Sequence, residues 1–506
     1  MKKITRFGYI INKNSLDDEC LTQIKKDLTV KPYKPGNFGK FAKDDTFSLY
    51  QENGDYIGIP KYYGLDKLGV PDINRLETYD YPIQNMKYKG QLRPVQENIV
   101  KNVIKGFEDN RGGLLLAGCG IGKTNMAIYI ACKYKLKTLF VVYKTFLKNQ
   151  VIDRIISTTN IKKVGVIQQK RVEIDYPFVV AMVQSLARIE YDDTVFKDFG
   201  MIIIDEVHHM GARNFSTVYQ KMSAKYMLGI SAERQRNDGL YKIINWYMGP
   251  ILHEEKQKPN DFVVVKQFYY KTDNEERSKI IINKYTKEPD RSTMITNLVK
   301  IKKRNRFILK LIENLFDQGK NILFLSGRIS QVNLLYSLIK ENNYMQHSVG
   351  KYIGSMSEKE LSLSGVKQII LGTYDMAQEG LDIENLNVVI LATPKSAIKQ
   401  SVGRILRKEV YEEHPIVIDI VDVKNAIFKK QSDRRLCYYL QNQYNIQKFD
   451  ISDYGENANW NDEEFIRMAL TKEPDASNTN KSGTSSYKSG TSHALDIDNI
   501  EFLDDD

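Results

Sequence analysis

The sequence predicts an α/β fold with two tandem lobes, each built on a parallel β-sheet with helices on both faces. Short, continuous apolar runs alternate with helical stretches over residues 91–255, and the same alternation starts again over residues 305–449. Such uninterrupted runs are typical of strands buried on both faces of a parallel sheet. In addition, 506 residues are too many for a single hydrophobic core.

Each lobe has its own set of expected elements. In the first lobe we expect a helix at 125–134 and strands at 113–117, 138–142, 178–183, 201–204 and 227–230. In the second lobe we expect a helix near 330–342 and strands at 321–325, 368–371, 388–392 and 416–420. Residues 256–304 are charged and weakly periodic, so we expect them to connect the two lobes.

Residues 1–90 are expected to form a small α+β accessory domain. They are rich in Tyr and Pro and show little helical periodicity. A β-hairpin is predicted from the strand-like runs 46–50 and 56–59 and from the turn residues 52–55 between them. The pattern gives no indication of what this domain does.

Residues 450–506 are expected to form a flexible, partly disordered acidic tail. They contain fourteen acidic and four basic side chains, a net charge of −10. The segment Lys-Ser-Gly-Thr-Ser occurs at 481–485 and again at 488–492, and such low-complexity sequence cannot bury a core. The final acidic residues are interpreted either as a docking peptide or as a solubilising segment, and the second is favoured.

Charge and composition limit the class of protein. The whole chain carries +11, so residues 1–449 carry +21. A body this basic suits a protein that binds a phosphate backbone, although surface solvation by Lys and Arg is an equal alternative. No membrane span or secretory signal is predicted. The widely spaced cysteines indicate reduced thiols of an intracellular protein; they are Cys20, Cys119, Cys132 and Cys437.

A phosphate-binding loop is predicted between the first strand and the helix that follows it. Its residues are Ala117, Gly118, Cys119, Gly120, Ile121, Gly122, Lys123 and Thr124. Backbone N–H groups of such a loop point at phosphate, the Lys123 ammonium reaches the β and γ oxygens, and the Thr124 hydroxyl binds Mg²⁺. The alternative is a Gly-rich turn with a chance Gly-Lys-Thr.

Two carboxylates follow the apolar run 201–204 directly. Asp205 and Glu206 therefore lie at the carboxyl end of a predicted buried strand, where parallel sheets bind ligands. Hydrolysis of a nucleotide needs one carboxylate on Mg²⁺ and one that polarises water. We assign the first role to Asp205 and the second to Glu206, rather than reading them as a structural acid pair.

Three polar residues of the second lobe share a helical spacing. Gln400, Arg404 and Arg407 fall at i, i+4 and i+7, which would place them on one face of a helix. Two arginines with one orientation suit a finger that neutralises charge in the transition state of phosphoryl transfer. A salt-bridged helix face is the alternative interpretation.

These motifs, in this order, resemble the core of superfamily 2 helicases. The loop at 117–124 is followed by Asp-Glu-Val-His at 205–208, Gly-Ile-Ser-Ala at 229–232, and Gln-Ser-Val-Gly-Arg-Ile-Leu-Arg at 400–407. The resemblance covers roughly residues 91–423. It implies two RecA-like lobes that hydrolyse ATP with Mg²⁺ while they hold nucleic acid.

The resemblance also implies roles for residues outside the main motifs. Gln96 would contact the adenine edge, and Gly380 and Asp382 would contact the nucleotide. His208 would couple the nucleotide site to the segment Ser231-Ala232. Contacts with nucleic acid would come from Lys144, Thr145, Gln184, Ser185, Arg328 and Thr373.

Within the superfamily, Cys119 and the segment 236–240 look like the excision-repair and transcription-factor translocases and the helicases of large cytoplasmic DNA viruses. This favours a DNA helicase or translocase in viral transcription or repair, with an RNA helicase as the alternative. Transcription or repair proteins are the expected partners, bound through the N-terminal domain or the tail. If viral, the protein is expected in the host cytoplasm or viral factory, with packaging in the virion as a further option. Glu233 stands where the family usually has Thr, which puts the coupling of hydrolysis to strand separation in doubt.

Overall fold

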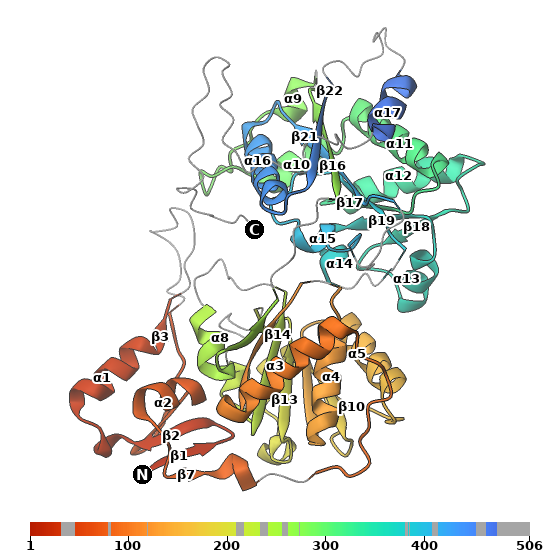
Figure 1. Ribbon diagram of the computed structural model, residues 1–506. Coiled ribbons are helices and arrows are strands. Elements are labelled where there is room, and N and C mark those ends of the chain that lie inside the picture. The colour runs from red at the N-terminus through yellow and green to blue at the C-terminus, as the bar shows by residue number, and fades with distance from the viewer. Residues whose placement is uncertain are drawn as a thin grey trace. The chain divides into compact units, whose positions relative to one another are not determined.

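The computed structural model contains two compact units, Met1–Gln257 and Lys258–Asp506 (Figure 1). It describes residues 1–31, 46–78, 82–118, 120–208, 217–232, 241–255, 262–272, 274–379, 383, 385–406, 413–451 and 462–472. Within these ranges, no helix is long and apolar enough to cross a membrane.

The first unit is built on an eight-stranded sheet in the order β11-β10-β12-β9-β13-β14-β8-β15. Only the β10–β11 pair is antiparallel. All five predicted strands are present. The strands are β8 Gly112–Leu116, β9 Thr138–Val142, β10 Gly165–Gln168, β11 Arg171–Val172, β12 Phe178–Met182, β13 Met201–Asp205, β14 Tyr226–Ser231 and β15 Ile251–Glu254.

Helices cover both faces of this sheet. One face packs against α3 (Pro94–Asn110), α4 (Lys123–Tyr134) and α5 (Thr145–Thr158), and the other packs against α6 (Val183–Arg188) and α8 (Tyr241–Met248). Neighbouring residues of β8 show the alternation. Leu115 packs in the core with α3, α4 and α5, whereas Leu114 and Leu116 pack in the core with α6 and α8. A single turn of 3₁₀-helix, η3, spans Asp193–Phe196.

The N-terminal residues form a five-stranded sheet in the order β5-β6-β2-β1-β7, with two helices against it. The main elements are β1 Lys2–Thr5, β2 Gly8–Asn12, α1 Asp18–Asp27, β5 Gln51–Asn53, β6 Tyr56–Ile59, α2 Lys61–Leu68 and β7 Ile73–Asn74. Smaller elements are η1 Lys13–Ser15, β3 Thr29–Val30, β4 Phe47–Ser48 and η2 Arg75–Thr78. We call residues 1–78 the N-terminal module. It is α+β, as predicted.

The predicted hairpin exists, but the predicted position of its first strand, 46–50, was wrong. Asn53 pairs with Tyr56, so Gly54 and Asp55 form a two-residue turn and the first strand is β5. Gly54 has a φ of 54°, a conformation that glycine adopts without steric cost. The run at 46–50 contains β4 instead, which pairs with β3.

The N-terminal module shares a hydrophobic core with the first unit's sheet. Tyr63 on α2 packs edge-on against Trp246 on α8, with ring centroids 5.3 Å apart. The buried ammonium of Lys61 donates to the carbonyl oxygens of Ala224 and Lys225 at 3.3 and 3.5 Å. Burial lowers the pKa of Lys61 to about 8. The module is therefore an integral part of the unit.

The second unit contains a seven-stranded, entirely parallel sheet in the order β18-β19-β17-β20-β21-β16-β22. The strands are β16 Val264–Tyr270, β17 Ile322–Ser326, β18 Val349–Tyr352, β19 Ile369–Thr373, β20 Val388–Leu391, β21 Ile416–Asp422 and β22 Asn445–Ile451. The helices are α9 Glu275–Ser278, α10 Arg291–Leu298, α11 Lys302–Asp317, α12 Ile329–Glu341, α13 Glu358–Gly365, α14 Tyr374–Glu379, α15 Lys399–Val402, α16 Ala426–Gln441 and α17 Asp462–Thr471.

Two predicted boundaries of the second lobe were wrong. Residues 256–304, expected to be a connector, contain β16, which lies inside the sheet between β21 and β22. The acidic tail was expected to begin at residue 450, but β22 runs to Ile451 and α17 buries Ile466 and Leu470 in the core. The repeated low-complexity segments lie outside the described residues.

A buried lysine fixes α17 to the sheet. Lys266 on β16 donates to the carbonyl oxygens of Ala469 and Lys472 at 2.9 and 3.0 Å, and to the side-chain oxygen of Gln447 at 2.9 Å. The two carbonyls lie at the end of the helix, where backbone acceptors have no partner within the helix. A cation there also interacts favourably with the helix dipole.

The shared core predicts that a single side chain of the N-terminal module stabilises the whole first unit. Tyr63→Ala removes a side chain that is 2% exposed, together with its 2.9 Å hydrogen bond to Asp27. We expect a loss of about 3–5 kcal/mol in the free energy of unfolding. Urea denaturation of the full chain measures this loss. Tyr56→Ala is the control, because Tyr56 is 42% exposed, and equal stability of the two variants would contradict the shared core.

Candidate functional site

The predicted phosphate-binding loop joins β8 to α4. Gly120 and Gly122 have φ angles of 82° and 88°, which turn the chain sharply into the helix. The Lys123 ammonium folds back over the loop and donates to the carbonyl oxygens of Ala117 and Gly118 at 3.0 and 3.3 Å. Thr124 is the second residue of α4 and half-buried. Cys119 lies outside the described residues.

Two side chains at the start of α3 form hydrogen bonds with this loop. The Gln96 amide nitrogen donates to the Ile121 carbonyl at 2.7 Å, and its amide oxygen accepts from the Arg93 backbone N–H at 2.9 Å. The Arg93 guanidinium also donates to the Ile121 carbonyl, at 2.7 Å. Gly122 has a φ of 88°, which residues other than glycine rarely adopt, and a Cβ there would also lie 2.3 Å from the Gln96 amide nitrogen. The role of Arg93 as a loop anchor was missed from the sequence.

Asp205 and Glu206 lie at the carboxyl end of β13, as predicted. Asp205 is buried, and burial and the neighbouring Glu206 raise its pKa to about 7, while Lys123 opposes this rise. Glu206 has a φ of 47°, which is uncommon outside glycine and typical of functional sites. Its Oε2 is buried without a hydrogen-bond partner among the described residues. This carboxylate therefore has an acceptor oxygen for a water or a proton.

Asp205 and Thr124 could hold a divalent cation. A cation would favour the ionised form of Asp205 and so offset the cost of its burial. The described residues contain no cluster of three or more His, Cys, Asp or Glu side chains that could hold a metal alone. Mg²⁺ is usually held by one or two protein ligands, substrate phosphates and water, so one carboxylate and one hydroxyl would suit it.

His208 links the acid pair to β14. Its Nδ1 lies 2.9 Å from the Ser231 hydroxyl and 3.4 Å from Glu206 Oε2. Ser231 also accepts a 3.0 Å hydrogen bond at its backbone oxygen from the N–H of Ala117, at the start of the loop. Ala232, the next residue, is buried. The three motifs of the first unit thus meet at one edge of the sheet.

The candidate nucleic-acid contacts of the first unit lie on two neighbouring loops. Lys144 and Thr145 begin α5 after β9, and Gln184 and Ser185 lie in α6 directly after β12. The Gln184 amide donates to the backbone oxygen of Tyr143, so the loops are joined. The Ser185 hydroxyl is buried and accepts from the Gln169 N–H at 2.9 Å.

In the second unit, Arg328 is committed to internal contacts. Its guanidinium donates to the Thr296 hydroxyl at 2.8 Å, to the Gly327 carbonyl at 2.7 Å, and to the carbonyl and hydroxyl of Ser292 at 2.6 and 2.8 Å. Arg328 thereby ties α10 to the end of β17. Thr373 ends β19 and is half-buried.

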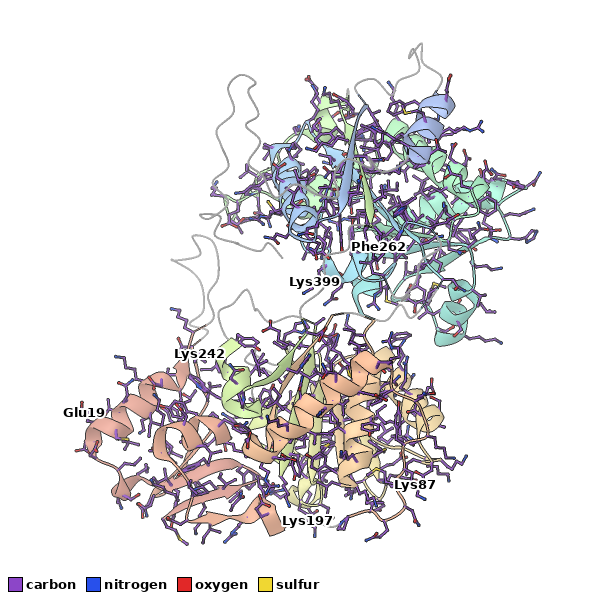
Figure 2. The ribbon with its side chains drawn as sticks, viewed as in Figure 1. Glu19, Lys87, Lys197, Lys242, Phe262 and Lys399 are labelled. Atoms are coloured by element: carbon purple, nitrogen blue, oxygen red, sulfur yellow. The ribbon has the colours of Figure 1, made fainter. Side chains whose placement is uncertain are left out.

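The predicted helix that carries Gln400, Arg404 and Arg407 is shorter than expected. Helix α15 ends at Val402 with Gly403 as its C-cap, and Arg404 lies in the following turn. The prediction that all three residues share one helix face was therefore wrong for Arg404. Figure 2 marks Lys399, where α15 begins. Arg407, Gly380 and Asp382 lie outside the described residues, as do Glu233 and 236–240.

Comparisons with known proteins identify the family. Residues 89–236 match the model of the type III restriction enzyme res subunit, and residues 303–409 match the helicase conserved C-terminal domain. A protein of Acanthamoeba polyphaga mimivirus, which carries the name of an ATP-dependent RNA helicase, is 62% identical over 100% of this chain and 99% of its own length. The chain belongs to the superfamily 2 helicases. The helicase is thus an ATP-hydrolysing enzyme that acts on nucleic acid.

Solved structures agree with this fold. Yeast (S. cerevisiae) Dbp5 bound to RNA matches with a TM-score of 0.51 and 13% identity, covering 80% of the helicase and 99% of Dbp5. The restriction-modification enzyme LlaBIII bound to DNA matches with a TM-score of 0.50 and 15% identity, over 76% of the helicase and 33% of LlaBIII. At such low identity the likeness shows the fold alone, two RecA-like lobes.

The acid pair predicts separable effects on binding and hydrolysis. Glu206→Gln removes the carboxylate charge without changing the side chain's shape, so ATP should still bind. Nucleic-acid-stimulated hydrolysis should fall at least about 10²-fold, the scale of losing a water-orienting or charge-stabilising group. Lys123→Ala should weaken ATP binding as well. Steady-state ATPase and equilibrium nucleotide binding measure both effects. Glu190→Gln, on an 88% exposed side chain, is the control, and parental turnover by Glu206→Gln would remove the assigned role.

The contacts of Gln96 predict how it influences nucleotide binding. Gln96→Glu keeps an acceptor for the Arg93 N–H but places a carboxylate against the Ile121 carbonyl. We expect the KM for ATP to rise about tenfold, the effect of an unpaired buried acceptor. As an anchor of the loop, Gln96 should affect ATP and GTP equally, whereas direct recognition of adenine would impair ATP alone. KM measurements with both nucleotides separate the two roles.

Proposed function

We propose that this helicase is an ATP-dependent DNA helicase or translocase. The observation that supports it most directly is the meeting of Lys123, the Asp205–Glu206 pair and Ser231 at one edge of the first unit's sheet. Lys123 would neutralise charge on the β and γ phosphates of ATP. Thr124 and Asp205 would hold Mg²⁺, which supplies charge neutralisation when bound. The roles proposed for Gln400, Arg404 and Arg407 rest on their motif alone.

In this proposal Glu206 takes the proton of the attacking water. Its Oε2 is a buried acceptor at the site, and its backbone adopts the left-handed conformation directly after β13. His208 lies between Glu206 and Ser231, so its position depends on both. A change at the acid pair during hydrolysis would therefore reach the segment Ser231-Ala232, which we propose as the coupling element.

The substrate proposed is the phosphate backbone of DNA. Residues 1–449 carry +21, and Lys87 and Lys197 are among the exposed lysines of the first unit (Figure 2). The res-subunit match supports DNA, and the mimivirus relative supports a viral helicase. A role in transcription or repair rests on the motif resemblance of Cys119 and the segment 236–240. RNA is the second candidate, favoured by the name that this relative carries.

ATPase assays with single-stranded DNA, duplex DNA and RNA, with Glu206→Gln as the inactive control, distinguish the two. Stronger stimulation by RNA would overturn the DNA assignment.

Backbone recognition predicts a strong dependence on salt. Each phosphate contact releases counterions, so the affinity for DNA should fall at least about tenfold between 50 and 200 mM salt. Oligonucleotides of different sequence should bind with similar affinity, because phosphate contacts carry no sequence information. Fluorescence anisotropy over a salt series measures both properties. A flat salt response or a strong base preference would contradict backbone binding.

A further inference from the structure

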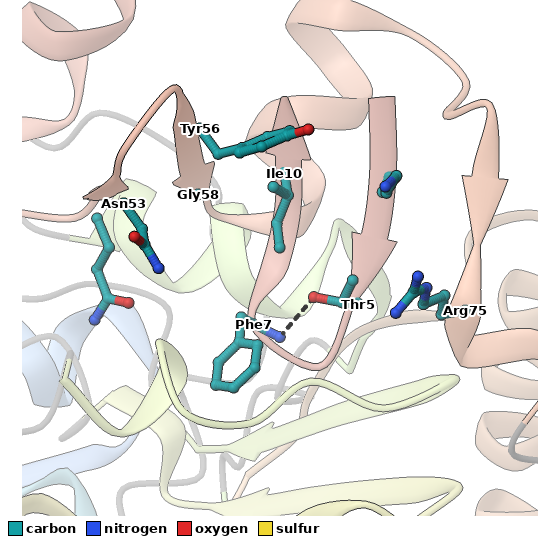
Figure 3. Close-up of a pocket in the computed structure, with 9 residues that line it drawn as sticks. Thr5, Phe7, Ile10, Asn53, Tyr56, Gly58 and Arg75 are labelled. Carbon is teal, nitrogen blue, oxygen red and sulfur yellow. Dashed lines mark hydrogen bonds between the residues drawn. The ribbon is translucent and has the colours of Figure 1, made fainter. Parts of the chain in front are cut away.

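The outer face of the N-terminal module's sheet contains a shallow hollow of about 510 Å³ (Figure 3). Side chains alternate between the two faces of a strand, so this face lies opposite the core residues Ile4, Tyr9, Ile11, Ile57 and Ile59. The hollow is lined by Lys3, Thr5, Phe7, Ile10, Gln51, Asn53, Tyr56, Gly58 and Arg75.

Two aromatic rings border the hollow and are open to solvent. Phe7 is 39% exposed and Tyr56 is 42% exposed. Phe7 comes from the turn between β1 and β2, and Tyr56 comes from β6. In Figure 3 the partly buried Ile10 lies between them. The Arg6 guanidinium lies 4.3 Å from the Phe7 ring centroid, and the Phe7 N–H donates to the Thr5 hydroxyl at 3.2 Å. Phe7 thus lies in the turn between β1 and β2, with the Arg6 guanidinium over its ring.

The polar groups of this face are cations and amides. Lys3 and Arg75 supply positive charge, Gln51 and Asn53 supply amides, and none of the described residues that line the hollow is acidic. Glu52, between the two amides in sequence, points away and pairs with Lys13 and Lys25 at 3.2 and 3.1 Å. The face thus combines positive charge with donors and acceptors for hydrogen bonds.

The middle of the hollow is open because Gly58 has no side chain. A Cβ at Gly58 would meet only the Gln51 backbone oxygen, at an ordinary 3.8 Å. Its φ is not positive, so the backbone does not require glycine there. A larger side chain would fit sterically and would fill the hollow. Space for a flat ligand therefore lies between the aromatic rings.

We infer that this face binds single-stranded nucleic acid, with bases stacked on Phe7 and Tyr56 and a phosphate on Lys3. Aromatic rings beside positive charge are the common features of single-strand binding surfaces, because every base offers a π-face to stack. The inference rests on the proposed function, since it adds a second contact for the same substrate. An acidic peptide would use the cations but not the exposed rings, so nucleic acid fits the face better.

The face is fixed relative to the nucleotide site of the first unit. The Arg6 guanidinium pairs with the Asp193 carboxylate at 2.8 Å, and the module shares its core with the sheet that carries the phosphate-binding loop. A strand held on Phe7 and Tyr56 would therefore keep a constant distance from that loop. The module would serve as a static grip during the ATPase cycle.

Fluorescence anisotropy with labelled oligothymidylate and oligouridylate, on the full chain, tests the inference. Stacking contributes about 1–3 kcal/mol per base, so Tyr56→Ala and Phe7→Ala should each weaken binding about 5- to 150-fold. Tyr56→Phe, which keeps the ring, should bind like the parent. Gly58→Leu should fill the hollow without offering a ring and should weaken binding. Lys3→Gln should lower the slope of log affinity against log salt by about 0.7. Tyr285→Ala, on a 95% exposed ring in the second unit, is the matched control.

Photo-crosslinking with 4-thiothymidine oligonucleotides gives a second readout, and crosslinks should map to Phe7 or Tyr56. Parental affinity in Tyr56→Ala and Phe7→Ala, without crosslinks to the module, would overturn the inference. If the two variants keep parental affinity for nucleic acid but no longer bind a synthetic peptide of residues 473–506, the face would be assigned to a protein segment. A parent that neither binds nor is stimulated by any nucleic acid would instead overturn the proposed function.

Discussion

The parallel register of β8, β13 and β14 positions the phosphate-binding loop, the Asp205–Glu206 pair and Ser231. Leu116 pairs with Ser231, and Ile230 pairs with Asp205, so the three motifs that follow these strands begin at the same level. The hydrogen bond from Ala117 to Ser231 continues this pairing into the phosphate-binding loop. A shift of one residue would turn Asp205 to the opposite face of the sheet, away from Lys123.

The motifs of the first unit could be predicted because each follows a continuous apolar strand. Leu114, Ile203 and Leu228 are all fully buried, so the strands before the loop, the acid pair and Ser231 gave a clear signal. What the sequence does not contain is the hydrogen bonding of Gln96 and Arg93 to the loop, since these contacts depend on how α3 packs beside it. The resemblance implies adenine contact for Gln96, and the structure adds its hydrogen bonds to Arg93 and Ile121.

In the second unit, buried polar residues hid a strand. The sequence of β16 contains Lys266 and Gln267, which look like surface residues but are 2% and 0% exposed. Gln267 donates to Asp419 at 2.9 Å, and Lys266 bonds to three groups around α17. Because these partners are distant in sequence, no local pattern reveals them. Arg404 differs, because the signal there was local: the helical spacing continued, but Gly403 lies at the end of the helix.

The place of β16 in the sheet also determines when this unit can fold. Lys266 and its partner Gln447 are 181 positions apart, and β22 pairs with β16 along its whole length. Parallel pairing at such separation is slow, because the long intervening chain must be ordered first. During synthesis β16 leaves the ribosome first, and the edge that pairs with β22 stays unpaired until β22 is synthesised. Chains that wait in this state are prone to aggregate, so recovery of the protein should depend on how quickly translation reaches β22.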